Sequence, residues 1–235
     1  MVAVSPKDVE HISRLTGNPA SLVINGVDCA HYQDIQPSLH SQRLLFVGNF
    51  EYNASLEAIE WALEDILPQV WQSNPAVRLA VVGHALPDSW KSRWSDPRIE
   101  WVGYLPDLRE LQRHSAIFFA PLRYAGGSKI KVLEAMAAGL PVVTTAKGVC
   151  GLQVTQGEHY LGSDDGDQLA LLITQLLNQP WRMRQLSEAA RQFVHERHDW
   201  SIAAAQLESV HARLSQRAPT LGNLSDNGLL SRSAE

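Results

Sequence analysis

The chain has 235 residues, of which 45% are hydrophobic and 19% are charged, and its formal net charge is −5. This composition is that of an ordinary globular protein, and an acidic balance without any basic run argues against nucleic acid as a partner. No segment reaches the ~20 apolar residues of a membrane span and no signal-peptide pattern opens the chain, which predicts a cytoplasmic protein, with attachment at the inner membrane surface as a variant.

The first part of the chain predicts a strand, a helix and a second strand. Residues 1–5 (MVAVS) are typical of a strand, and residues 6–15 are typical of a helix that a glycine ends. Residues 21–24 form another apolar run, followed by Asn-Gly, which favours a turn. Residues 29–42 are polar and aperiodic, as in a linker. We therefore expect a small unit over residues 1–28.

Apolar runs alternate with amphipathic stretches through residues 43–198. The predicted strands are residues 44–47, 79–82, 99–102, 117–120, 142–145 and 159–161. The predicted helices are residues 55–67, 87–94, 107–114, 128–138, 164–178 and 180–197. This alternation indicates a Rossmann-like α/β domain, a parallel sheet covered by helices on both faces. A last helix is expected over residues 199–214, and a disordered tail over residues 215–235.

The turns that follow the predicted strands are the places to look for a ligand. In open parallel sheets, ligands bind beyond the carboxyl ends of the strands. Glycines gather in these turns, at Gly48-Asn49, Gly83-His84, Gly103-Tyr104, residues 124–128 and Lys147-Gly148. They would let the backbone approach phosphate groups closely, but tight turns alone also account for such glycines. The chain has neither a G-x-G-x-x-G fingerprint nor a Walker loop.

Glu134 is the most informative residue of the strand–loop–helix–strand unit at residues 116–145. The helix of this unit is expected to be capped by Ser128. From Val132 to Leu140 the other side chains are apolar or glycine, so this carboxylate is expected to be buried and to need a partner. Two alternatives follow: a local ion pair with the lysine three residues earlier, or a carboxylate aimed at ligand hydroxyls across a cleft.

Residues 126–145, GGSKIKVLEAMAAGLPVVTT, resemble the donor-binding motif of family 4 glycosyltransferases, which have the two-domain GT-B architecture. The resemblance implies that Glu134 holds the ribose hydroxyls of a nucleotide-diphosphate sugar. It also implies that Gly126, Gly127 and Ser128 lie beside the diphosphate or the sugar. A helix start suits that role, because its open N–H groups and positive end attract anions. The family commonly carries a second glutamate where this chain has Gly126, which leaves the sugar contact unassigned.

The resemblance also concerns the residues that would stabilise charge on the departing diphosphate. Many members of the family carry a Gly-Arg pair after the first strand and a lysine shortly beyond it. This chain has Gly48 and Asn49 at the first place and no cation at the second. Lys129 is therefore the expected cation, with Lys131 and Arg123 behind it, and a surface position is the alternative for each.

Tyr104 is expected to flank the nucleobase, by analogy with the base-contacting loop of the family, with packing at the rim as the alternative. No essential metal and no cofactor beyond the donor substrate are expected. The chain has no Asp-x-Asp pair, His84 is isolated, and the pair His195 and His198 lies at a charged helix end. Two cysteines lie far apart, which predicts free thiols.

The resemblance covers roughly residues 1–215 and implies an enzyme of polysaccharide biosynthesis in which Lys129 and Glu134 are the catalytic candidates. It would transfer a sugar, with retention, from a nucleotide-diphosphate-sugar donor to a hydroxyl of a glycan or a lipid-linked acceptor. The chain would be the donor-binding half, and residues 1–28 the end of an acceptor domain of roughly 150 further residues or more. A separate chain could also supply that domain. The alternatives are a nucleotide-sugar-binding module without catalysis and, more distantly, a sugar-nucleotide epimerase.

Overall fold

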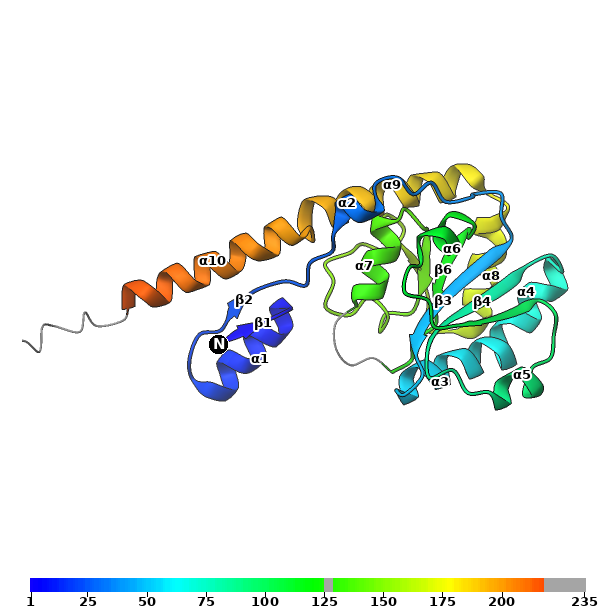
Figure 1. Ribbon diagram of the computed structural model, residues 1–235, viewed down its shortest axis with the longest axis horizontal. Coiled ribbons are helices and arrows are strands. Elements are labelled where there is room, and N and C mark those ends of the chain that lie inside the picture. The colour runs from blue at the N-terminus through cyan, green and yellow to red at the C-terminus, as the bar shows by residue number, and fades with distance from the viewer. Residues whose placement is uncertain (125–128, 218–235) are drawn as a thin grey trace, which may run out of the picture.

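A parallel sheet of six strands organises the molecule (Figure 1). The computed structural model describes residues 1–124 and 129–217. The strand order is β5-β4-β3-β6-β7-β8, so the chain starts in the middle of the sheet, builds one half and then crosses to the other. The strands are β3 (Arg43–Asn49), β4 (Arg78–His84), β5 (Ile99–Gly103), β6 (Ile117–Ala120), β7 (Val142–Thr144) and β8 (Leu161–Gly162). The predicted Rossmann-like α/β fold is confirmed, and its strand order reverses between β3 and β6.

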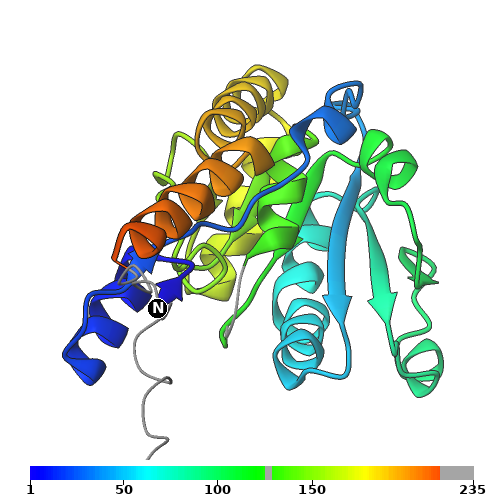
Figure 2. The same ribbon diagram turned by 60° about the vertical axis from the view of Figure 1, so that its left-hand side comes forward.

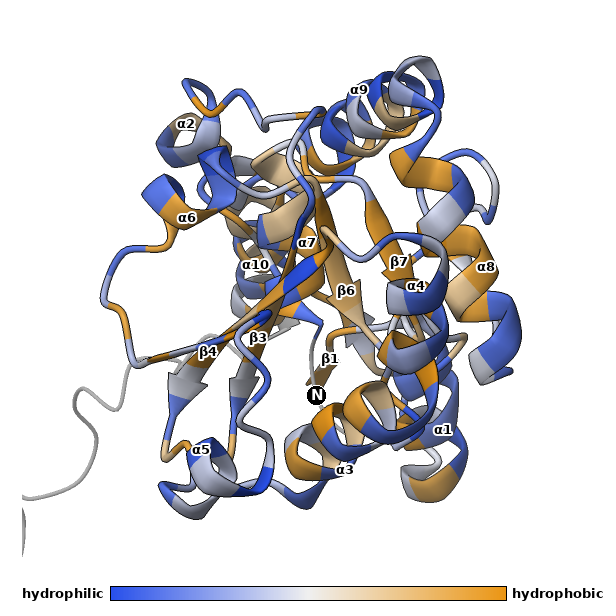
Figure 3. Ribbon diagram, turned by 90° about the vertical axis from the view of Figure 1, so that its right-hand side faces the viewer, coloured by the Kyte–Doolittle hydropathy of each residue, from blue (hydrophilic) through white to orange (hydrophobic). Residues whose placement is uncertain are grey.

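Helices cover both faces of the sheet because successive residues of each strand point to opposite sides. Leu44 and Phe46 of β3 pack on one face with α3, α4 and α8, whereas Leu45 packs on the other face with α7 and α9. Figure 3 shows β6 and β7 as hydrophobic strands with helices on either side. The helices are α3 (Asn53–Trp61), a π-helical turn (Ala62–Ile66), α4 (Leu67–Ser73), α5 (Ser89–Arg93), α6 (Arg109–Arg113), α7 (Ile130–Ala137), α8 (Gly166–Leu177), α9 (Pro180–Arg197) and α10 (Trp200–Arg217).

Pro68 explains why the helix predicted over residues 55–67 is longer and less regular than expected. The helical segment begins at Asn53 and continues to Ser73, with the π-helical turn Ala62–Ile66 in its middle. A proline in the first turn of α4 has no N–H to donate, and its ring crowds the carbonyl one turn earlier. The backbone therefore widens into a π turn just before the proline.

β3 extends further than predicted. Gly48 and Asn49, which were expected to begin a turn, continue the strand and pair in register with Gly83 and His84 of β4. A Cβ atom at Gly83 would lie 1.7 Å from the carbonyl oxygen of Gly48, and one at Gly48 would lie 2.7 Å from the ring of Phe46. Gly83 is therefore required by the close approach of β3, and Gly48 by the packing of aromatic side chains of its own segment.

The N-terminal residues form a small unit beside α10 (Figures 1 and 2). β1 (Val2–Ala3) and β2 (Ser21–Leu22) pair in parallel, and α1 (Pro6–Thr16) connects them. Ser5 caps α1 by accepting a hydrogen bond from a first-turn N–H at 3.2 Å, and Gly17 ends the helix with a φ of 66°. No residue of α1 is buried, so this unit adds little to the hydrophobic core.

The segment that connects this unit to the large sheet contains a short helix, α2 (Cys29–Tyr32), within the predicted linker. Before it, Val27 forms a parallel bridge with Asp199, ahead of α10. The N–H of Ile24 also donates to Oε1 of Gln206 on α10 at 2.9 Å. These contacts join the first and last parts of the described chain next to the sheet.

Element boundaries near the end of the chain also differ from the prediction. The strand expected at residues 159–161 is the later β8, because His159 accepts the N–H of Thr155 and holds the chain in a turn. α10 continues past the expected end at residue 214 to Arg217. The predicted tail lies outside the described residues from position 218 onward. None of the helices in the described part is long and apolar enough to cross a membrane.

Candidate functional site

A cleft of about 760 Å³ opens at the carboxyl ends of β3 and β6. These strands are parallel neighbours, with Leu44 opposite Ile117, and the order of the sheet reverses between them. The starts of α3 and α7 form the two sides of the cleft, and apolar side chains such as Phe46, Phe118 and Leu122 contribute much of its wall. Its position and volume are those of a ligand site in an open parallel sheet.

Four residues that the sequence predicted for the site line this cleft. Asn49 comes from the end of β3, and the others, Lys129, Lys131 and Glu134, come from the start and first turns of α7. Of the remaining predicted residues, Gly48 and Tyr104 are not part of the cleft wall, and Gly126, Gly127 and Ser128 fall outside the described residues. The structure therefore brings the predicted charged side chains of α7 to one place.

Glu134 is a half-buried carboxylate in the wall of the cleft. Burial raises the pKa of Glu134, while the charge of Lys131 and the hydroxyl of Tyr32 on α2 lower it. Burial and the neighbouring Glu134 carboxylate likewise raise the pKa of Tyr32. Glu134 therefore has a charged lysine neighbour and also lines the cleft, and the choice between the two alternatives stays a prediction.

Lys129 lies immediately before α7 and not inside the helix as predicted, with a non-helical backbone (φ −94°, ψ 39°). It is only 7% exposed, and burial lowers its pKa. Burial also lowers the pKa of Lys131, which the charge of Glu134 raises in return. Desolvated ammonium groups favour contact with an anion, and the start of α7 adds the positive end of a helix dipole. This end of the cleft is therefore suited to a negatively charged group.

Arg123, the third predicted cation, is directed toward α3. Its guanidinium forms an ion pair with Glu57 and lies 4.6 Å above the ring of Trp61. Asn49 also has a local role, because its side-chain oxygen accepts the N–H of Glu51 at 3.1 Å and shapes the turn after β3. Of the predicted cations, only the two lysines next to and within α7 line the cleft.

Tyr104 follows β5 and lies outside the cleft wall. Its side chain is 68% exposed, and its ring meets the ring of His84 edge-on, with 6.4 Å between the centroids. His84 in turn lies 3.7 Å from the carboxylate of Glu51. The predicted contact of Tyr104 with a nucleobase remains a prediction.

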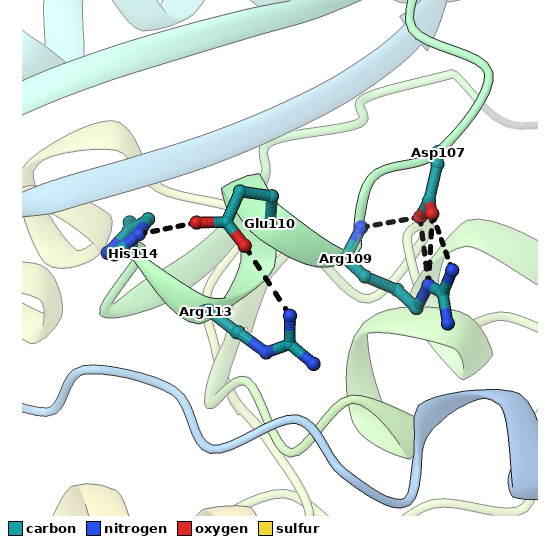
Figure 4. Close-up of polar contacts among 5 residues, drawn as sticks. All are labelled: Asp107, Arg109, Glu110, Arg113 and His114. Carbon is teal, nitrogen blue, oxygen red and sulfur yellow. Dashed lines mark hydrogen bonds and ion pairs between the residues drawn. The ribbon is translucent and has the colours of Figure 1, made fainter.

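Charged residues on α6 and just before it form a small network, from Asp107 to His114, which Figure 4 shows. The carboxylate of Asp107 accepts from the backbone N–H of Arg109 at 3.0 Å and from its guanidinium at 2.7 Å. This pairing lowers the pKa of Asp107 to about 2. Glu110 contacts Arg113 and His114 in the same way. The helix predicted to start at residue 107 begins two residues later, at Arg109.

A family model described as "Glycosyl transferases group 1" matches residues 41–179, which is more than half of the chain. The chain belongs to this family. It is 28% identical over 211 residues to a phosphatidyl-myo-inositol mannosyltransferase of Mycobacterium tuberculosis, covering 83% of the chain and 54% of the relative. It is 26% identical over 212 residues to a glycogen synthase of the same species, covering 85% of the chain and 50% of the relative.

The crystal structure of Anabaena HepE in complex with UDP and glucose superposes on this glycosyltransferase-family chain with a TM-score of 0.70 at 17% identity. The superposition covers 91% of the chain and 62% of HepE. This similarity of fold agrees with the GT-B architecture that the motif at residues 126–145 implied. The chain spans about half the length of the curated relatives it matches, from 41% to 54%.

Three tyrosines of the site were not assigned to it from the sequence. Tyr52 and Tyr124 line the cleft, and Tyr32 lies beside Glu134. A signal for the first two is present, because each occurs in the turn after a strand whose carboxyl end faces the ligand side. Tyr32 gave no comparable signal, since it lies in the predicted linker, far from residues 116–145 in the sequence.

Of the pair His195 and His198, the second residue lies at the junction between the two ends of the described chain. His198 is buried, and its Nδ1 lies 3.1 Å from the carbonyl oxygen of Asn25. Within residues 1–124 and 129–217, no group of three or more His, Cys, Asp or Glu side chains could hold a metal ion. The expectation that the family member needs no essential metal stays a prediction.

Proposed function

We propose that the cleft between α3 and α7 binds a nucleotide-diphosphate sugar and that the chain is the donor-binding half of a glycosyltransferase. The observation that carries this proposal is the position of Lys129, Lys131 and Glu134 in one cleft, where the strand order of the sheet reverses. A carboxylate that accepts hydrogen bonds from hydroxyls and two cations that attract phosphate are the groups such a donor needs. Membership of the glycosyltransferase family and the UDP complex of HepE support the assignment.

The distances along α7 fit the parts of such a donor. Glu134 comes four residues after Ile130, the first residue of α7, which corresponds to about 6 Å along the helix axis, and Lys129 directly precedes that start. Glu134 would accept hydrogen bonds from the ribose hydroxyls, while Lys129 and the start of α7 would contact the diphosphate. Lys131 lies between these positions in the sequence, and its charge favours the ionised form of the Glu134 carboxylate.

The reaction that follows is transfer of the sugar to a hydroxyl of a glycan or a lipid-linked acceptor, with retention of anomeric configuration. The bond between the sugar and the diphosphate breaks, and a bond from the acceptor oxygen to the same carbon forms. Lys129 and Lys131 stabilise the negative charge that develops on the diphosphate as it leaves. Glu134 is the only carboxylate of the described residues in the cleft wall, and the ribose occupies it in this proposal. No covalent sugar–enzyme intermediate is therefore included.

Calorimetric titration of the purified chain with UDP, GDP and their glucose and mannose conjugates tests the proposal. We expect micromolar binding of at least one of these ligands, weakened at least ~10-fold, about 1.4 kcal/mol, by Glu134→Gln. Glu188→Gln is the matched control, because Glu188 is exposed on α9 and away from the cleft. A folded chain that binds none of these nucleotides would show that the cleft is not a donor site.

The second candidate is a module that binds nucleotide sugars without transferring them. The observation that favours it is Asn49, which stands where the resemblance places an arginine, so one cation for the leaving group is missing. An acceptor domain on a separate chain could then complete the enzyme. Donor binding together with no release of nucleoside diphosphate, even with glycan or lipid-linked acceptors present, would favour this candidate.

A further inference from the structure

We propose that Tyr52 and Tyr124 form an aromatic clamp that holds the sugar ring of the donor, the group that is transferred. This inference rests on the proposed function and assigns the sugar contact that the glycine at position 126 leaves open. It names two residues that determine affinity for the sugar and not for the nucleotide.

The two tyrosines come from two different chain segments at the same end of the sheet. Tyr52 is in the turn after β3 and directly precedes α3, whereas Tyr124 follows β6 on the way to α7. Because β3 and β6 are parallel neighbours, the segments that leave their carboxyl ends emerge side by side. Both side chains line the cleft.

The rings of both tyrosines remain available for a ligand. Each side chain is 66% exposed although it lines the cleft, so neither is used to fill the hydrophobic core. Neither ring stacks on another aromatic ring of the described residues, in contrast to Tyr104, which meets His84. Two accessible aromatic faces at the mouth of a partly apolar cleft favour a ligand that has apolar faces of its own.

The connectivity of the donor decides which part of it reaches these rings. Base, ribose, diphosphate and sugar follow one another in that order in every nucleotide-diphosphate sugar. With the ribose at Glu134 and the diphosphate beside Lys129, the sugar continues in the direction away from Glu134. That direction leads past the start of α7, toward the segment that holds Tyr124 and the part of the cleft lined by Tyr52, which directly precedes α3.

A sugar ring suits this position chemically. A pyranose presents C–H groups on its faces and hydroxyls around its edge, and the face of an aromatic ring carries negative charge density that attracts polarised C–H groups. A tyrosine on each side can therefore cover the sugar without competing for its hydroxyls. The phenol groups at the rim stay in water, where they are compatible with the exposure of both side chains.

Titrations with matched ligands separate this inference from the proposed function. The affinity for a nucleoside diphosphate is compared with that for its sugar conjugate, using UDP with UDP-glucose and GDP with GDP-mannose. We expect Tyr52→Ala and Tyr124→Ala each to weaken binding of the conjugate about 5-fold, and the double variant roughly 10–30-fold. Binding of the nucleoside diphosphate alone should stay within about twofold of wild type. Circular dichroism confirms that each variant is folded.

Two controls define the chemistry. Trp181→Ala removes an exposed aromatic side chain of similar accessibility on α9, outside the cleft, and should leave both affinities unchanged. Tyr52→Phe and Tyr124→Phe keep the rings and should bind the conjugate like wild type, whereas loss of affinity in these variants would overturn the stacking.

The possible outcomes distinguish the two proposals. Equal weakening of diphosphate and conjugate by the alanine variants would place the tyrosines at the nucleotide and overturn the clamp. Unchanged affinities in the alanine variants, with wild-type binding intact, would overturn the clamp but leave the proposed function standing. A wild-type chain that binds neither member of either ligand pair would overturn both.

Discussion

The charged side chains of the cleft lose water when the chain folds. This desolvation shifts each pKa in the direction that favours the neutral form of the group. Burial lowers the pKa of Lys129 and Lys131 and raises that of Glu134. Lys131 and Glu134 partly compensate each other, because each charge stabilises the other. A bound diphosphate would relieve the lysines further, so ligand binding and protonation are expected to be coupled in this site.

This coupling gives Glu134 a measurable effect on stability. The folded protein holds a proton on Glu134 more tightly than the unfolded chain, so ionised Glu134 lowers the free energy of unfolding once the pH exceeds the ordinary glutamate range. Lys131, the hydroxyl of Tyr32 and the charge of His31 limit this loss. Glu134→Gln removes the ionising group and with it this loss of stability. We expect the variant to melt above wild type by roughly 1–3 °C at pH 8, with the difference vanishing toward pH 4.

Thermal unfolding of wild type, Glu134→Gln and the exposed control Glu188→Gln between pH 4 and pH 8 measures this difference. The control should follow wild type throughout. A difference that does not change with pH, or a variant that melts below wild type at pH 8, would contradict the assignment of a buried, ionising Glu134.

The individual site residues were predictable from the sequence to different degrees. Glu134 and Lys129 could be singled out because they lie five residues apart in one sequence motif, next to the glycines at positions 126 and 127. Tyr32 could not be found, because it reaches Glu134 through the packing of α2 on α7. Arg123 was equally plausible as a cleft cation until the ion pair with Glu57 turned it toward α3.

α7 carries the site, and its far end is fixed by a residue of α9. Arg191 donates from Nη2 to the carbonyl oxygens of Ala138 and Ile35, at 2.6 Å each. Ala138 and Ile35 are fully buried, so no water can replace these bonds. Arg191 therefore satisfies a backbone carbonyl oxygen at the end of α7 and also attaches the segment after α2 to this helix end.

Arg191→Met is expected to cost about 2–3 kcal/mol of unfolding free energy, because two buried carbonyl oxygens lose a charged donor. Urea unfolding monitored by circular dichroism measures the loss. Arg184→Met, a change at an exposed position of the same helix, should cost less than about 0.5 kcal/mol. An equal effect of the two variants would show that the contacts of Arg191 do not hold α7 in place.

At the scale of elements, hydrophobic periodicity predicted which segments are helices and strands but not how they end. The π-helical turn before Pro68 and the extension of β3 through Gly48 both depend on local backbone geometry. The pairing of Gly48 with Gly83 could not be read from either segment alone, since Gly83 is explained by the backbone of β3 that lies against it.

For the whole molecule, the alternation of strands and helices predicted the parallel sheet, and the sequence motif predicted the family. The strand order, which places the cleft between β3 and β6, came only from the structure. How the predicted N-terminal unit is attached also came only from the structure: Ile24 joins it to α10, and a cavity of about 380 Å³ lies between the unit and α10. This cavity is a second place where a ligand could bind.

A crystal structure of the chain with a bound nucleoside diphosphate tests most directly where the donor binds. We predict that the nucleotide occupies the cleft between α3 and α7, with its phosphates beside Lys129 and its ribose hydroxyls within hydrogen-bonding distance of the Glu134 carboxylate. A nucleotide in the cavity between the N-terminal unit and α10, or one in the cleft that contacts neither Lys129 nor Glu134, would contradict the account.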